Sequence, residues 1–433
     1  MFSKIRDFVN DSYFMDNIDN LAFILLGLML FISVFAPSEC IGGFSLMFSS
    51  LVIFKQIFKG NFKISLADYE KAVLIFFLIV TVSLFGSTLF KLSLHGYIKT
   101  LIYIIFFFCA TVFFKQNKSK APLLIYLTVG LMSFEALLAI FQNYAGVAEI
   151  SGWQDMTNIN PEQVISRAYG TLKPYNPNLL AGYLLCGLAS FVYLILANLK
   201  ASRKRFSLIY LVLFLITLVA IIDTGCRGAY LGFLFFFPVL TVALLYHVHK
   251  AFGGLNNIGK RYKNIFFASI IGLILFIATN PALIKRVQSI FALRADSSIS
   301  FRLNVYESVW RMFLDNIFLG IGVGNQNFRE IYGLYMKTGY DALGSYCVPL
   351  EIAVESGIFA LLAFVAFLIL FIRKCFRIFK DEKYPINSKI LALSLVLIIC
   401  AVMGHGLFDT IWFRPQIQFL FWTNIAMLKI LED

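Results

Sequence analysis

The chain has 433 residues, of which 60% are hydrophobic, 17% aromatic and 14% charged, and its mean hydropathy is +0.81. These values exclude an ordinary soluble globular domain. The net charge of +13 does not indicate nucleic acid, because the basic residues are shared among many short connectors and form no continuous stripe.

Apolar runs separated by clusters of charge predict an all-α polytopic membrane protein. About twelve runs are long enough to cross a hydrocarbon layer of roughly 30 Å. They lie near 20–36, 40–57, 70–90, 97–114, 121–143, 176–198, 206–222, 228–248, 263–279, 348–372, 388–405 and 412–430. Most Lys and Arg residues fall on the side that also holds both termini, so the positive-inside rule predicts a bacterial inner membrane protein with cytoplasmic termini.

The spacing of the runs predicts three parts. Residues 1–279 hold the first nine transmembrane helices, 280–347 form a long periplasmic loop, and 348–433 hold the last three helices. A polar stretch precedes the first apolar run, so we expect that run to remain as an anchor. The seven cysteines have no zinc-like spacing, and the sequence predicts neither a metal nor a cofactor.

Within the long loop, residues 299–315 have the periodicity of an amphipathic helix that lies along the membrane surface. Four polar residues share one side of it: Asn304, Glu307, Arg311 and Asp315. Arg302 falls on the apolar border. It either snorkels to cover apolar surface or holds a guanidinium in a semi-dry site that grips a phosphate.

A second arginine lies in the turn "DTGCRGAY" between two predicted spans. Arg227 either pairs with Asp223 or points its charge at lipid phosphates of the outer leaflet. In "KPYNPNLLAGYLL", Asn176 is predicted to cap a helix with Pro177 at its first position, which leaves Asn178 available at the mouth of the site.

The C-terminal motif "GHGLFDTIWFRP" places His405 and Asp409 four residues apart on one helical face, with Arg414 beyond them at the outer interface. The pair is either a proton relay or a satisfied polar patch. Glu135, in the middle of a predicted span, either has a functional role or is a protonated acid bonded to a neighbouring helix.

Four segments together resemble the O-antigen ligase and polymerase superfamily. They are "RAYGTLKPYNPNLLAGYLL" (167–185), "DTGCRGAYLGF" (223–233), "SFRLNVYESVWRMFLDNIFLGIGVGNQNF" (300–328) and "SYCVPLEIAVESGIFALLAFV" (345–365). Within that superfamily the chain most resembles the cyanobacterial branch labelled as bicarbonate transporters. The resemblance implies a twelve-helix protein that takes a glycan from undecaprenyl pyrophosphate, with Arg227 and Arg302 on the pyrophosphate and membrane lipids around it.

One position departs from the family pattern. Ligases of the family carry a His-Asn or His-Ser pair before the Glu-x-Gly motif, and Tyr346 and Cys347 occupy those two positions here. A tyrosine is a poor base at neutral pH. Glu351 is therefore the expected general base and Glu355 the expected partner of an arginine such as Arg302 or Arg414, unless both acids only favour a helix N-terminus.

Two functions follow as expectations. The first is a glycosyltransferase or ligase that transfers or polymerises saccharide from undecaprenyl pyrophosphate to an acceptor glycan or lipid at the periplasmic face. Its predicted catalytic residues are Glu351, Arg302 and Tyr346. Its predicted substrate-binding residues are Arg227, Arg302, Asn176, Asn178, Arg414, His405, Asp409 and Glu355. The alternative is a transporter of bicarbonate or another anion, which would need a polar route across the bilayer.

Overall fold

The computed structural model describes residues 2–59, 65–145, 167–252 and 297–432, and these contain helices but no strand. The α-helices are α1 Phe2–Asn10, α2 Tyr13–Ile32, α3 Ser38–Lys59, α4 Asp68–Gly86, α5 Phe90–Gln116, α6 Ala121–Tyr144, α7 Pro177–Lys200, α8 Lys204–Asp223, α9 Arg227–Phe252, α12 Ser297–Asp315, α13 Asn325–Tyr332, α14 Val348–Lys380, α15 Ile386–Gly406 and α16 Pro415–Ala426. Short 3-10 helices are η1 Lys118–Lys120, η5 Ile411–Phe413 and η6 Met427–Leu431.

Ten helices of the described residues are long and apolar enough to cross a membrane. They coincide with ten of the predicted runs and confirm an all-α polytopic membrane protein. The predicted span 263–279 lies outside the described residues. The predicted span 412–430 is not one long helix, because α16 has 12 residues and is continued by the 3-10 turns of η6.

The last segment packs inside the bundle. Every residue from Gln416 to Lys429 is buried, and α16 contacts α5, α7 and α3. The rise of α16 and η6 together is about 28 Å, close to the thickness of the hydrocarbon layer. Aromatic side chains fill the space around it, with Trp422 against Phe107 and Phe367.

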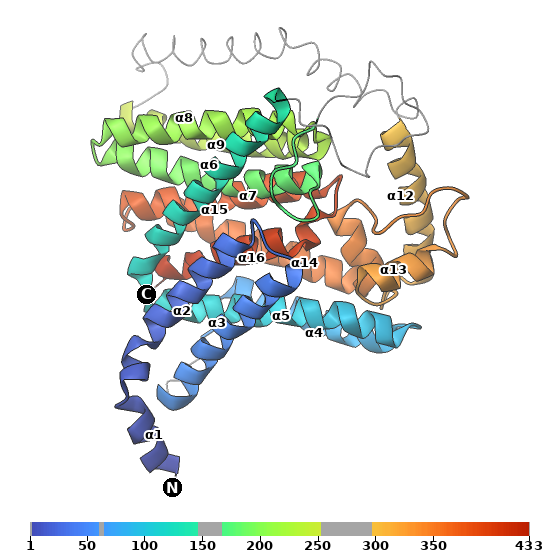
Figure 1. Ribbon diagram of the computed structural model, residues 1–433, viewed down its shortest axis with the longest axis horizontal. Helices are drawn as coiled ribbons and strands as arrows, with labels where there is room; N and C mark the ends of the chain where they lie inside the picture. Colours follow the sequence, from blue (N-terminus) through green and yellow to red (C-terminus); the bar gives the residue numbers. More distant parts are fainter. Residues whose placement is uncertain (1, 60–64, 146–166, 253–296, 433) are drawn as a thin grey trace.

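The long helices form one bundle, and α12 runs across one end of it beside α13 (Figure 1). Helix α15 packs against α9, α7 and α14, and α14 packs against α4. At the end covered by α12 and α13, helices α7, α9, α14 and α16 begin and α15 ends. We call this the loop end. The opposite end, where α7, α9 and α14 end and α15 begins, is called the connector end.

Helix α14 is broken at the loop end, at Gly357 (φ 81°, ψ 174°). The segment 317–322 fills the break, because the N–H groups of Ile321 and Gly322 donate to the carbonyls of Val354 and Glu355 at 2.9 Å each. In return the N–H of Ile358 donates to the carbonyl of Ile317 at 2.7 Å. The freed helix carbonyls are thus satisfied by protein.

Candidate functional site at the loop end

The predicted amphipathic helix is present as α12, Ser297–Asp315. Its polar side is held by the segment that follows α13. Lys337 Nζ donates to Glu307 at 2.6 Å and to Asn304 at 3.2 Å, and Asp315 accepts from Tyr335 at 2.9 Å. These contacts fix the rotation of α12 and therefore the direction of Arg302 on its other flank.

Arg302 is half-buried and lies over an aromatic ring. Its Cζ is 5.7 Å from the centroid of Tyr346, a cation–π distance. Its Nη1 donates to Ser298 Oγ at 3.2 Å, while its Nε is buried and has no hydrogen-bond partner among the described residues. No carboxylate of the described residues forms an ion pair with Arg302. Its guanidinium group is therefore available to bind an anion.

Tyr346 sits in the connector before α14 with a left-handed backbone (φ 55°). Its carbonyl accepts a hydrogen bond from the hydroxyl of Tyr306 at 3.1 Å. Burial and then Asp409 raise the pKa of Tyr346, while Arg302 opposes them. A phenol with a raised pKa keeps its proton at neutral pH, so Tyr346 can support the guanidinium but is a poor base.

A hydrogen-bonded chain connects the starts of α7 and α9 with the end of α15. Arg167 donates to the Thr224 carbonyl at 2.8 Å and to Asn178 Oδ1 at 2.7 Å. Asn178 Nδ2 donates to Asp409 Oδ2 at 2.9 Å. Asn176 caps α7 as predicted, since its side chain accepts from the Asn178 N–H at 2.8 Å. The predicted residues Asn178 and Asp409 are therefore in direct contact.

His405 lies near the end of α15 and is fully buried. Its Nε2 is 3.4 Å from Cys226 Sγ, and a side chain at Gly228 would overlap the imidazole ring. Burial raises the pKa of the Cys226 thiol, but His405 lowers it and the net shift is downward. The His405 Nδ1 is also buried, and no described residue bonds to it.

Electrostatic contacts tie these groups into one site. Asp409 and Arg302 both lie within electrostatic range of Tyr306 and Tyr346. Arg302 also lies within electrostatic range of His405. Arg227 is the first residue of α9 and directly follows Cys226. Arg227 and Arg302 therefore lie at the same end of the bundle. The ion pairs of the described chain include none between Arg227 and Asp223.

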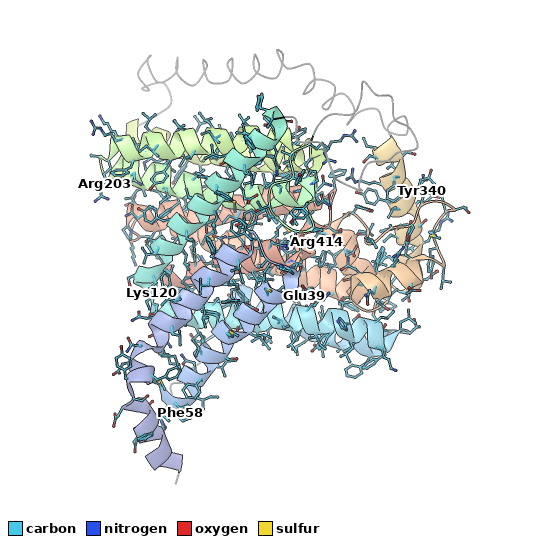
Figure 2. The ribbon with its side chains drawn as sticks, viewed as in Figure 1. Glu39, Phe58, Lys120, Arg203, Tyr340 and Arg414 are labelled. Carbon is cyan, nitrogen blue, oxygen red and sulfur yellow. The ribbon has the colours of Figure 1, made fainter. Side chains whose placement is uncertain are left out.

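Arg414 directly precedes α16, makes no capping hydrogen bond with its side chain and is half-buried (Figure 2). It lies within electrostatic range of Tyr103 on α5. No ion pair to Arg414 occurs within the described ranges. It places a third cation at the loop end, on the far side of η5 from Asp409.

The two acids of α14 point to different partners. Glu355 Oε1 accepts from the Gly324 N–H at 2.8 Å, just before α13 begins. Glu351 accepts from the Ser345 N–H, and its carboxylate and the Thr410 hydroxyl both lie next to Gly344. Neither acid is in an ion pair with an arginine in the residues that the structure covers, so the expected pairing of Glu355 with Arg302 or Arg414 is absent there.

Glu135 and Gln142, both on α6, bond to the segment that leads into α7. The Thr171 hydroxyl donates to Glu135, and the Thr171 N–H donates to it at 3.0 Å. Gln142 Oε1 accepts from the Gly170 N–H at 2.9 Å. These contacts place the polar groups of α6 at the loop end. Glu135 is bonded to the segment before α7 and not, as the predicted alternative had it, to a neighbouring helix.

The sequence reasoning missed Arg167, Thr224 and Cys226 as members of the site. Arg167 lies in a segment singled out for its resemblance, but nothing in its spacing indicates that it bridges α7 and the α8–α9 turn. Among the described residues no group of three His, Cys, Asp or Glu side chains could hold a metal ion.

Comparison with known proteins bears on residues 211–365, which run from α8 into α14 and contain Arg227, Arg302, Glu351 and Glu355. No curated protein matches the chain. This segment matches the family model described as O-antigen ligase. The chain as a whole is a multi-pass helical membrane protein.

Proposed function

We propose that the protein transfers or polymerises a saccharide carried on undecaprenyl pyrophosphate, at the periplasmic face of the bacterial inner membrane. The match to the O-antigen ligase family supports a membrane glycan-processing function. The proposal goes beyond that match in three respects: the lipid carrier of the saccharide, the membrane face and the type of reaction. The arrangement of cations at the loop end supports these three parts.

The half-buried guanidinium of Arg302 is the observation that carries the proposal. It lies over Tyr346, with a buried Nε that no described residue bonds. A diphosphate offers the acceptor oxygens that such a group matches, and charge-assisted hydrogen bonds to phosphate are strong in a site shielded from water. Arg227 and Arg414 add positive charge at the same end.

In the proposed reaction the hydroxyl oxygen of the acceptor forms a bond to the anomeric carbon of the donor saccharide. The bond from that carbon to the pyrophosphate oxygen breaks, and the electron pair leaves with undecaprenyl pyrophosphate. Arg302 and Arg227 stabilise the charge that develops on the leaving group. The proton of the acceptor hydroxyl passes to a carboxylate of the protein.

Two carboxylates are candidates for that proton. Glu351 is the base expected from the sequence, but it is buried and one of its oxygens is held by the Ser345 N–H. Asp409 acts electrostatically on the same tyrosines as Arg302 and is held by Asn178 through Oδ2. Glu351→Gln and Asp409→Asn would each remove one candidate without changing side-chain size, so the variant with the lower kcat identifies the base.

The test is to incubate the purified protein with an undecaprenyl-pyrophosphate-linked oligosaccharide and candidate acceptor glycans or lipids. We expect a larger glycan product and the release of undecaprenyl pyrophosphate in equal amounts. Release without product would indicate hydrolysis. Neither product with any acceptor, from protein that is folded and pure, would count against the proposal.

No observation within the described residues favours the alternative of anion transport. Glu135 and Gln142, the polar groups that the sequence places within a span, are bonded to the segment before α7. Uptake of bicarbonate by proteoliposomes would be the result that supports the alternative.

A further inference from the structure

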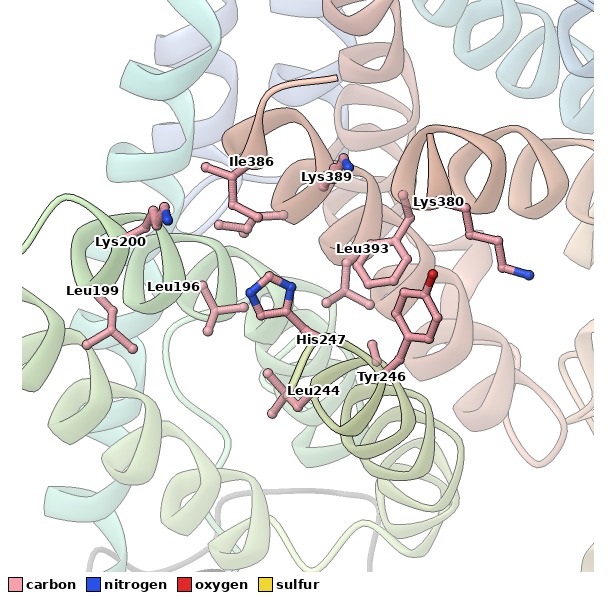
Figure 3. A pocket seen from close by; sticks show the side chains of 13 residues that line it. Leu196, Leu199, Lys200, Leu244, Tyr246, His247, Lys380, Ile386, Lys389 and Leu393 are labelled. Atoms are coloured by element: carbon pink, nitrogen blue, oxygen red, sulfur yellow. The ribbon is translucent and has the colours of Figure 1, made fainter. Parts of the chain in front are cut away.

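A pocket lies at the connector end, on the opposite side of the bundle from the candidate site. Its volume is about 370 Å³. It is lined by the last turns of α7, α9 and α14 and by the first turns of α15 (Figure 3). Because the candidate site lies where the first three of these helices begin and where α15 ends, the pocket belongs to a different surface of the protein.

The inner wall of the pocket is apolar. Leu196, Phe379, Ile390 and Leu393 are among the side chains that form it. Leu199 on α7 and Leu244 on α9 both line the pocket and are 54% and 39% exposed. The apolar wall is therefore continuous with the lipid-facing surface of α9, which allows an acyl chain to enter from the side.

The polar part of the lining is basic. Lys200, Lys380, Lys389 and His247 are present, with Tyr246, and no acidic residue lines the pocket. Figure 3 shows His247 near the middle of the pocket, with Lys200 and Lys389 on the same side of it, while the amine of Lys380 points away. Lys200, Lys389 and His247 thus form a basic rim above an apolar wall.

The lysines of the rim differ from two nearby lysines that have carboxylate partners. Towards the same end, Lys429 is paired with Glu70 and Glu432 at 2.7 Å each, and Lys374 is paired with Glu432 at 3.3 Å. The ion pairs of the described residues include neither Lys200 nor Lys389. Lys429 and Lys374 are thus paired with carboxylates, whereas Lys200 and Lys389 are not.

The surrounding connectors are also basic. The sequence "KASRKRF" follows α7 and "RKCFRIFK" ends α14. By the positive-inside rule this end faces the cytoplasm, where the leaflet carries anionic lipids. The charge of such a headgroup complements the rim, and its acyl chains complement the wall.

We propose that this pocket binds an anionic glycerophospholipid of the inner leaflet, with its phosphate at Lys200, Lys389 and His247 and an acyl chain along the apolar wall. The proposal is independent of the reaction at the loop end. A soluble anion could bind to the basic rim but would leave the apolar wall exposed. A zwitterionic lipid would cover the apolar wall but has no net negative charge to pair with the basic rim.

The test uses the full-length protein in detergent and native mass spectrometry. Phosphatidylglycerol and phosphatidylethanolamine with the same acyl chains are added in equal amounts. We expect the wild-type protein to retain phosphatidylglycerol preferentially. Lys200→Gln and Lys389→Gln should each lower that preference by roughly fivefold.

The matched control is Lys383→Gln, which removes one exposed lysine from the connector between α14 and α15 but lies outside the pocket lining. It should keep the preference. Both rim lysines reach the surface, so neither single substitution is expected to prevent folding. Equal loss in the control, or no preference in the wild type, would overturn the proposal. Displacement of the lipid by inorganic phosphate would assign the pocket to a soluble anion instead.

Discussion

Arg302→Ala is expected to lower glycan transfer by about two to three orders of magnitude while the protein remains inserted in the membrane. Loss of one preorganised donor to developing charge typically costs about that much. Arg302 is half-buried and forms no ion pair with a described residue, so its replacement breaks no such pair. We therefore expect the loss in kcat/KM, measured with purified protein, and little change in the midpoint of thermal unfolding.

Arg311→Ala is the matched control. Arg311 lies on the same helix, is 64% exposed in its side chain and is paired with Glu307. An exposed pair of this kind contributes at most about 1 kcal/mol, so this variant should retain activity. Arg227→Ala should also lower glycan transfer, because it removes a second positive charge from the same end of the bundle. If Arg302→Ala and Arg311→Ala have the same activity, a phosphate-binding role for Arg302 is excluded.

Gly357→Ala is expected to destabilise the protein by about 2–5 kcal/mol. A side chain at residue 357 would require a left-handed backbone that alanine disfavours and would overlap the carbonyl oxygen of Phe318. To remove that overlap, segment 317–322 would have to move away from the break in α14. We expect a lower midpoint of thermal unfolding in detergent.

Gly43→Ala is the control for this substitution. Gly43 lies in α3, where an added Cβ would meet no atom within 4 Å. Alanine there should stabilise the helix by up to about 1 kcal/mol. Equal midpoints for the Gly43 and Gly357 variants would show that the break in α14 does not depend on glycine.

Local patterns in the sequence were sufficient for much of the fold. Ten of the apolar runs, the amphipathic helix that became α12 and the cap at Asn176 are present in the described residues. Each of these depends on neighbouring residues or on helical periodicity, which a single sequence displays directly.

Contacts between residues far apart in the chain could not be predicted from the sequence. Glu355 bonds to the Gly324 N–H and not to an arginine, because the break at Gly357 brings segment 317–324 against α14. Helical periodicity assumes a continuous helix and cannot anticipate this. Arg167 and Cys226 belong to the site through contacts with residues far along the chain, Thr224 and His405.

The central claim is that guanidinium groups at the loop end hold a diphosphate, and a binding measurement tests it most directly. Undecaprenyl pyrophosphate is titrated against undecaprenyl monophosphate with the wild-type protein and with Arg302→Ala, Arg227→Ala and Arg311→Ala. We predict tighter binding of the pyrophosphate by the wild type and by Arg311→Ala, and loss of that preference in the other two variants. The same affinity for both lipids, or a preference that survives removal of Arg302 and Arg227, would contradict the account.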